Sequence, residues 1–292
     1  LDLIRTADVM VTNLRPGPLS RLDLSYGVIS QVRPDIVFCQ AAGFPSDGPR
    51  ADAPAYDDII QGASGLTHLA GVGNIGTPHY APFALADRMT GLSAVSHVLA
   101  ALYGRSRSGK GCAIDVTMFE TMTRIAMFDH LQGETFLPPL GPTGYARHLS
   151  RYRKPYATSD GWVCVMIYSD RHWLRFFDAI GRRDLLERDP ALATIEGRTQ
   201  RIDELYGLVE QELSQMDTRS AVALLESIDA PVMAMRSVDE LLSDPHLLAT
   251  GFIGEQDHPT EGRLRSLAPG SSWFDNPLPP PRSEEHTSEL QS

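Results

Sequence analysis

The first forty residues contain a strand–helix–strand pattern, which restricts the fold more than any other feature of the chain. A short apolar run at Val9–Thr12 precedes residues 19–32, whose apolar positions recur at roughly helical spacing. Pro34 and Asp35 then break the chain before a second β-rich run at Ile36–Cys39. Two strands joined by one crossover helix run parallel, so the chain is predicted to be an α/β protein with an open parallel sheet.

Further elements of the same kind follow along the first half. Helical spacing predicts helices at 57–69, 84–104 and 120–132, and Ala113–Thr117 is predicted to be another strand. The helix at 84–104 is the clearest. Gly104 is predicted to end it, and its apolar face is expected to comprise Leu92, Val95, Leu99, Ala100 and Leu102.

The second half changes character. Tyr156–Ile167 reads as a hairpin with its turn at Ser159–Gly161, and helices are predicted at 173–180, 199–215 and 218–227. This pattern indicates a second, smaller α+β domain.

Composition narrows the class of function. The net charge of −11 disfavours nucleic acid as a main partner. The chain contains no run of eighteen apolar residues, so no membrane span is predicted. The three cysteines are odd in number and widely spaced, which argues against a disulfide framework and fits a reducing cytosol. A cytoplasmic protein is therefore expected.

Two familiar kinds of site have little support. Gly71–Gly76 matches the glycine pattern of dinucleotide-binding loops, but a predicted helix precedes it and Thr77-Pro78 follows, so a plain loop is expected. No histidine pair has the spacing of a zinc helix, so no metal site is predicted from His68, His79, His97 and His130.

Asp87 is the most informative polar residue, because it stands where the helix at 84–104 begins. An aspartate there commonly caps the helix by accepting an N–H bond. The same position also suits a carboxylate nucleophile, since the helix dipole and free amides favour the ionised form. The local residues leave both readings open.

The chain resembles the family III CoA-transferases, the CaiB–BaiF group. The resemblance rests on Ala7–Gly17 (ADVMVTNLRPG), Gly43–Pro49 (GFPSDGP) and Ala86–Gly91 (ADRMTG), followed in order by Ser108–Gly111 and Ile114–Val116. Motifs of the second half continue it to about residue 278.

The resemblance implies a Rossmann-like large domain, a smaller α+β domain and an interlocked homodimer. The sheet is expected to be incomplete at the N-terminus, where the family has further structure. The implied organisation is a partial CoA-binding domain at 1–135, a linker at 136–150, a small domain at 151–250, a return to the large domain at 251–281, and a tail at 282–292 that reads as translated sequencing adaptor.

The resemblance also implies a site. Asp87 falls on the catalytic aspartate, which would carry CoA as an aspartyl-CoA thioester between an acyl-CoA and a carboxylic acid. Asn13, Leu14, Arg21 and Tyr56 fall on CoA-contacting positions, with Arg21 expected to meet a phosphate. Pro54 replaces a lysine of some relatives. CoA and acyl-CoA are substrates, and no permanently bound cofactor is expected.

Two alternatives to this activity are kept. An α-methylacyl-CoA racemase resembles the chain but has a histidine where Tyr56 stands, and a tyrosine of ordinary pKa is a poor base at neutral pH. A non-catalytic CoA-binding paralogue is disfavoured because Asp87 is present. The glycine-rich loop of formyl-transferring relatives is not recognisable, and the sequence names neither acyl donor nor acceptor.

Overall fold

The computed structural model describes residues 1–73 and 76–271 and divides into two units. One comprises Leu1–Lys154 with Arg183–Gln211, and the other comprises Pro155–Arg182 with Glu212–Ser292. The domain limits expected from the sequence stay a prediction. The expectation for residues 282–292 lies outside the described residues.

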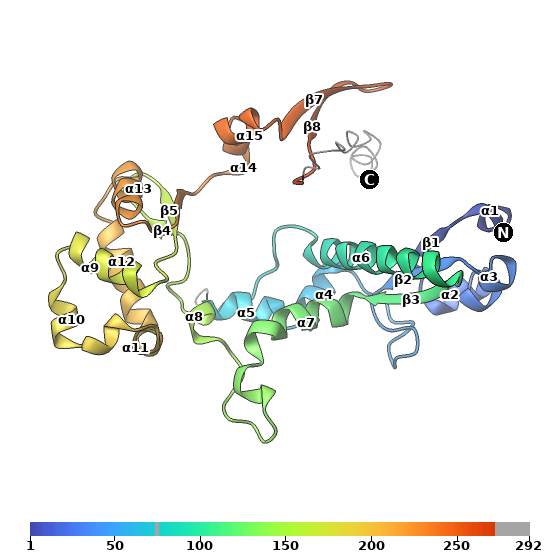
Figure 1. Ribbon diagram of the computed structural model, residues 1–292, viewed down its shortest axis with the longest axis horizontal. Helices are drawn as coiled ribbons and strands as arrows, with labels where there is room; N and C mark the ends of the chain where they lie inside the picture. The colour runs from blue at the N-terminus through green and yellow to red at the C-terminus, as the bar shows by residue number, and fades with distance from the viewer. Residues whose placement is uncertain (74–75, 272–292) are drawn as a thin grey trace. The chain divides into compact units, whose positions relative to one another are not determined.

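The first unit is built on a parallel three-stranded sheet in the order β1-β2-β3, as predicted (Figure 1). Its strands are β1 (Val9–Thr12), β2 (Val37–Ala42) and β3 (Cys112–Thr117). In register, Thr12 lies beside Gln40 and Ala42 beside Thr117, so the three carboxyl ends share one edge. The central strand β2 is almost wholly buried, which its unbroken run of mostly apolar residues explains.

Two helices predicted as single elements are each divided. The 19–32 segment forms α2 (Pro16–Arg21) and α3 (Tyr26–Val32), with Asp23 between them at φ +53°. The 57–69 segment forms α4 (Asp57–Ala63) and α5 (Leu66–Gly73), with Gly65 at φ +86°. One residue in the left-handed region is enough to end a helix. The glycine run at 71–76 begins inside α5, and residues 74 and 75 lie outside the described residues.

Helix α6 (Leu85–Ser108) runs alongside the sheet, but it turns the opposite face inward from the one that its large apolar residues indicate (Figure 1). Its buried residues are the small Ala86, Thr90 and Ala94, and Ala94 packs with Cys39 of β2 and Val116 of β3. Leu92, Val95 and Leu99 are 58–64% exposed. The helix passes Gly104 and ends at Gly109, at φ +71°.

Helix α7 (Met118–His130) follows β3 directly and completes the core beneath the sheet edge. Met118 and Met122 pack with Phe44, with Ile60 of α4 and with Ala86 of α6. This cluster joins α4, α6 and α7 at the ends that lie nearest the carboxyl edge of the sheet.

Shorter elements complete the first unit. Among the described residues they are α1 (Asp2–Thr6), η1 (Gln132–Thr135), α8 (Ala146–Leu149), α10 (Asp184–Arg188), η2 (Pro190–Ala193), α11 (Ile195–Gln200) and most of α12 (Ile202–Leu213).

The second unit contains the predicted hairpin. Strands β4 (Tyr156–Ala157) and β5 (Trp162–Val165) pair antiparallel, and β6 (Val232–Ala234) joins β5. Asp160 in the turn accepts hydrogen bonds of 2.7 Å from the backbone N–H and the hydroxyl of Thr218. The remaining elements are α9 (Asp170–Ala179), α13 (Thr218–Ser227), α14 (Val238–Leu241), α15 (Pro245–Ala249) and the hairpin of β7 (Ile253–His258) and β8 (Gly262–Leu267).

Within the described ranges, no helix has both the length and the apolar character needed to cross a bilayer.

Arg105, in the last turn of α6, ties that end of the helix to the amino ends of two strands. Its guanidinium lies 2.9 Å from Oδ1 of Asp8 and donates to the carbonyl oxygens of Asp8 (3.1 Å) and Asp35 (3.3 Å). These residues precede β1 and β2, so one side chain spans helix and sheet.

Replacing Arg105 with alanine should lower the free energy of unfolding by about 1 kcal/mol, a small value because Asp8 is exposed and screened. Urea denaturation followed by circular dichroism measures the change. Arg107→Ala, on the same helix turn, is the matched control and should change the midpoint less. Equal midpoints for the two variants would contradict the bridging role.

Candidate active site

A pocket of about 530 Å³ lies at the carboxyl edge of the parallel sheet. Its walls come from the loop after β1, the end of β2, the start of α7, the residues leading into α4 and the first turns of α6. In open α/β sheets, ligands bind at this edge, where loops from neighbouring strands converge.

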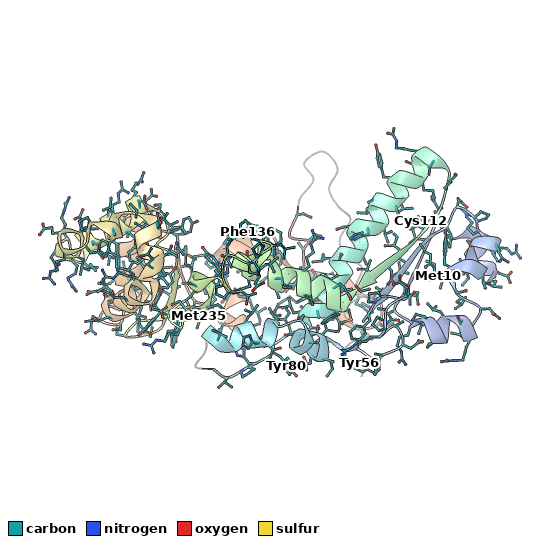
Figure 2. All side chains as sticks on the ribbon, turned by 90° about the horizontal axis from the view of Figure 1, so that it is seen from below. Met10, Tyr56, Tyr80, Cys112, Phe136 and Met235 are labelled. Atoms are coloured by element: carbon teal, nitrogen blue, oxygen red, sulfur yellow. The ribbon has the colours of Figure 1, made fainter. Side chains whose placement is uncertain are left out.

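Four of the five residues expected at a CoA site line this pocket. They are Asn13, Leu14, Tyr56 and Asp87, which come from three separate segments. Tyr56 is 77% exposed, and its side chain is labelled in Figure 2. Arg21 does not line the pocket; it is exposed in the last turn of α2, and its role stays a prediction.

The loop after β1 is held by polar contacts from the sheet. The backbone N–H of Leu14 donates to the Thr12 hydroxyl at 3.1 Å. The backbone carbonyl of Leu14 accepts a hydrogen bond from Nε2 of the buried Gln40 at 2.9 Å. The backbone on which Asn13 and Leu14 stand is therefore fixed from both sides.

Arg15 lines the pocket beside Leu14, and sequence reasoning did not single it out. Of the described residues around this pocket, Arg15 alone carries a positive charge. Its guanidinium donates to the backbone carbonyl of Asp52, whose carboxylate accepts the Gly17 N–H at 2.8 Å. The sequence feature that could have identified Arg15 is its position in the loop directly after a strand.

Two glycines shape the pocket in different ways. A Cβ on Gly43 would lie 2.2 Å from the Cβ of Ala55, so only glycine lets the segment before α4 approach the end of β2. A Cβ on Gly91 would meet no described atom within 4 Å, which leaves open space beside the first turns of α6.

The capping role considered for Asp87 is wrong. The N-cap of α6 is Ala84, and Asp87 is the third helical residue. The Asp87 backbone N–H donates instead to Oδ1 of Asp57 at 2.9 Å, so Asp57, in the first turn of α4, caps this helix from outside. Sequence spacing could not show this, because the two residues are thirty positions apart.

The electrostatics of Asp87 also differ from the expectation. Burial, and then the negative charge of Asp57, raise the pKa of the Asp87 carboxyl above its ordinary value. The helix terminus alone would favour the ionised form. Burial, together with the charge of Asp57, outweighs that effect, so the pKa of Asp87 lies above that of a free aspartate.

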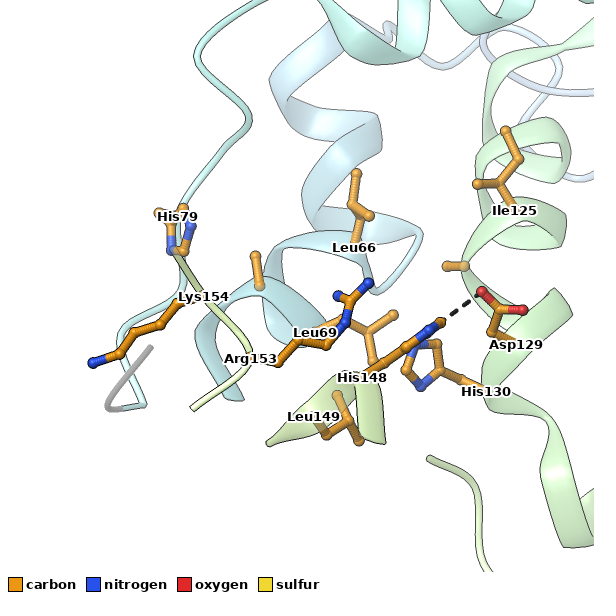
Figure 3. Close-up of a pocket in the computed structure, with 12 residues that line it drawn as sticks. Leu66, Leu69, His79, Ile125, Asp129, His130, His148, Leu149, Arg153 and Lys154 are labelled. Atoms are coloured by element: carbon orange, nitrogen blue, oxygen red, sulfur yellow. Dashed lines mark ion pairs between the residues drawn. The ribbon is translucent and has the colours of Figure 1, made fainter. Parts of the chain in front are cut away.

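A second pocket, of about 470 Å³, contains none of the expected residues (Figure 3). Nδ1 of His148 lies 3.6 Å from Oδ2 of Asp129, and the rings of His148 and His130 are 6.0 Å apart. Burial, with Arg153 nearby, lowers the pKa of His148. Sequence reasoning treated the histidines as isolated, because residues eighteen positions apart carry no local signal.

No group of three or more His, Cys, Asp or Glu side chains arranged to hold a metal ion occurs in residues 1–73 and 76–271.

The chain is similar to several characterised proteins. A succinate–glutarate CoA-transferase of Agrobacterium fabrum is 28% identical over 86% of this chain and 62% of its own length. Human succinyl-CoA:glutarate CoA-transferase is 24% identical over 99% of this chain and 66% of its own length. This chain thus spans slightly less than two thirds of either relative.

The fold is shared with a solved structure, and the sequence matches the model of a protein family. The crystal structure of a CaiB/BaiF family protein from Brucella suis superposes with a TM-score of 0.73 at 26% identity, covering 99% of this chain and 76% of that one. The model of CoA-transferase family III matches residues 1–287. The chain therefore belongs to CoA-transferase family III.

Proposed function

We propose that this protein transfers CoA from an acyl-CoA to a carboxylic acid, with Asp87 as the nucleophile. The observation that carries the proposal is the pocket itself. It gathers Asp87 with three of the family's CoA-contacting positions, Asn13, Leu14 and Tyr56, at the sheet edge where ligands of such folds bind.

The proposed chemistry proceeds through covalent intermediates on one carboxylate. Asp87 attacks the thioester carbonyl and releases CoA thiolate, which leaves a mixed anhydride of Asp87 and the donor acid. The thiolate then attacks the aspartyl carbonyl, releases the donor carboxylate and leaves an aspartyl-CoA thioester. The acceptor carboxylate attacks that thioester, and the returning thiolate attacks the acceptor carbonyl, which restores Asp87 and forms the new acyl-CoA.

The position of Asp87 supports this role. Asp87 lines the pocket, and the N-cap of α6 is Ala84, so Asp87 is not the capping residue of its own helix. Its raised pKa makes it more basic, and a more basic carboxylate is a stronger nucleophile while it remains ionised. Gly91 leaves space beside it for a thioester to approach.

The substrates are proposed from the pocket and from the relatives. Succinyl-CoA with glutarate is the first pair to assay, because two relatives carry these names. Arg15 is the cation that would meet either a CoA phosphate or the second carboxylate of such an acid. No permanently bound cofactor is proposed, and the cytoplasm is the proposed compartment.

The racemase alternative is less well supported. Racemases of this fold are expected to carry a histidine where Tyr56 stands, and no histidine is among the described residues that line the pocket. Proton exchange at the α-carbon needs a base of moderate pKa, such as the histidine of those racemases.

A homodimer is also proposed, interlocked as the resemblance implies. Leu92, Val95, Leu99 and Tyr103 recur along α6 at helical spacing and are 58–65% exposed. A contiguous exposed apolar stripe of this kind is typical of a subunit interface. A second copy of the chain is the proposed occupant.

The covalent intermediate is tested by mass spectrometry of the protein incubated with succinyl-CoA. The peptide that contains Asp87 should gain the mass of CoA less water, and Asp87→Asn should lose transfer activity by about 10⁴-fold or more. Asp58→Asn is the matched control and should behave like the wild type. An unmodified Asp87 peptide together with rapid α-proton exchange would favour the racemase, and full turnover by Asp87→Asn without deamidation would exclude the mechanism.

The anion contact is tested by comparing two arginine variants. Arg15→Ala should raise the KM of one anionic substrate by about tenfold, whereas Arg21→Ala should change it little. A rise in the KM of the acyl-CoA assigns Arg15 to a CoA phosphate, and a rise in that of glutarate assigns it to a carboxylate. If Arg21→Ala has the larger effect, the structural assignment of Arg15 is wrong.

The dimer is tested by light scattering after size-exclusion chromatography. Leu99→Glu places a charge in the centre of the exposed stripe and should shift the mass toward one subunit. Ala100→Glu is the control, because it is exposed on α6 beside the stripe. A wild-type mass for Leu99→Glu would show that this stripe is not the interface.

A further inference from the structure

The carboxylate of Asp57 connects two helices that both begin at the pocket. Asp57 is the first residue of α4, and its Oδ1 accepts the backbone N–H of Asp87 in α6 at 2.9 Å. Its Oδ2 accepts from Nε2 of Gln61, one turn further along α4. Both oxygens of Asp57 are therefore engaged.

Gln61 extends this connection to the segment before α6. Its side chain is 1% exposed, and its Oε1 accepts the Ala81 backbone N–H at 2.8 Å. Because Ala81 N–H can only donate and the Asp57 carboxylate can only accept, the amide of Gln61 has one orientation. The chain of contacts fixes both the approach to α6 and its first turn.

Because of this arrangement, the Asp87 side chain is not needed to cap the N-terminus of α6. The first amides of a helix have no intrahelical partner, and an acidic residue at the third position commonly turns back toward them. Ala84, the N-cap of α6, has no side-chain oxygen to offer. Asp57 supplies the acceptor from another helix, so the Asp87 carboxylate is left for the pocket.

We propose that Asp57 is the positioning residue of the site, which holds the Asp87 backbone through its amide and keeps the Asp87 carboxylate free to attack. This inference rests on the function proposed above. Asp57 touches no substrate in this role and acts only through Asp87.

The charge of Asp57 has a second effect on the same group. Burial and then Asp57 raise the pKa of Asp87. Among the described residues, Arg15 and Tyr56 line the same pocket, and the guanidinium of Arg88, the next residue of α6, lies over the Phe83 ring at 5.8 Å. Removing the Asp57 charge should therefore lower the pKa of Asp87, and activity should persist to lower pH.

The test compares three variants with a control. Asp57→Ala removes the acceptor and should lower kcat by about 10²-fold while the KM of the acyl-CoA stays within about threefold, because the nucleophile is misplaced and the CoA contacts are not. In Asp57→Asn alone, the new side-chain N–H₂ faces the N–H₂ of Gln61. Both groups are donors, so the hydrogen bond between residues 57 and 61 is lost. The double variant Asp57→Asn/Gln61→Glu restores every hydrogen bond and moves the charge away from Asp87.

The double variant should recover kcat to within about fivefold of the wild type. Its kcat/KM should fall at a lower pH than in the wild type, because the pKa of Asp87 is lower without the adjacent charge. Asp58→Asn, on the neighbouring residue of α4, should leave both quantities unchanged. Wild-type kcat in Asp57→Ala, or no recovery in the double variant when its melting midpoint equals that of the wild type, would overturn the proposal.

A readout independent of turnover separates this inference from the proposed function. Carbodiimide modifies protonated carboxyl groups, so the pH midpoint for labelling of the Asp87 peptide reports its pKa. The midpoint should be lower in Asp57→Asn/Gln61→Glu than in the wild type, and an unchanged midpoint rejects the coupling even if Asp57→Ala does not fold. If the midpoint shifts but the wild type forms no CoA adduct, the proposed function fails and the coupling stands.

Discussion

The site depends on the parallel hydrogen bonding of three strands. Because β1, β2 and β3 run in one direction and in one register, the residues that follow each strand emerge at the same edge. The loop after β1 supplies Asn13, Leu14 and Arg15, the end of β2 supplies Ala42, and the start of α7 supplies Met118. No single segment forms the pocket; the sheet brings the segments together.

Two helix N-termini then converge on this edge and set its electrostatics. The cluster of Ile60, Ala86 and Met118 packs α4 and α6 close enough for Asp57 to reach the amide of Asp87. The arrangement places the charge of Asp57 near Asp87, which lines the pocket together with one cation, Arg15, among the described lining residues. The acidity of Asp87 follows from this packing more than from the helix on which it stands.

The sequence predicted the features that local patterns encode. The strands, the parallel sheet and the hairpin of the second unit agree with the structure, because alternation and turn residues act over a few positions. Helix breaks at Asp23 and Gly65 were missed, since helical periodicity does not report one residue with positive φ. Periodicity also groups Leu92, Val95 and Leu99 on one face without saying whether that face is buried.

Arg15, Asp57 and the His130–His148 pair were missed because contacts between distant residues define them. Asn13, Leu14, Tyr56 and Asp87 were found through family motifs and meet in one pocket.

The small residues on the buried side of α6 have a mechanical consequence. A helix of 24 residues is about 36 Å long, and Asp87 stands near one end of it. Ala94 packs this helix against Cys39 of β2 and Val116 of β3. A bulkier side chain at position 94 would tilt the helix and displace its N-terminal end. Changes in side-chain volume two turns from Asp87 can therefore change the position of its carboxylate without altering any residue that lines the pocket.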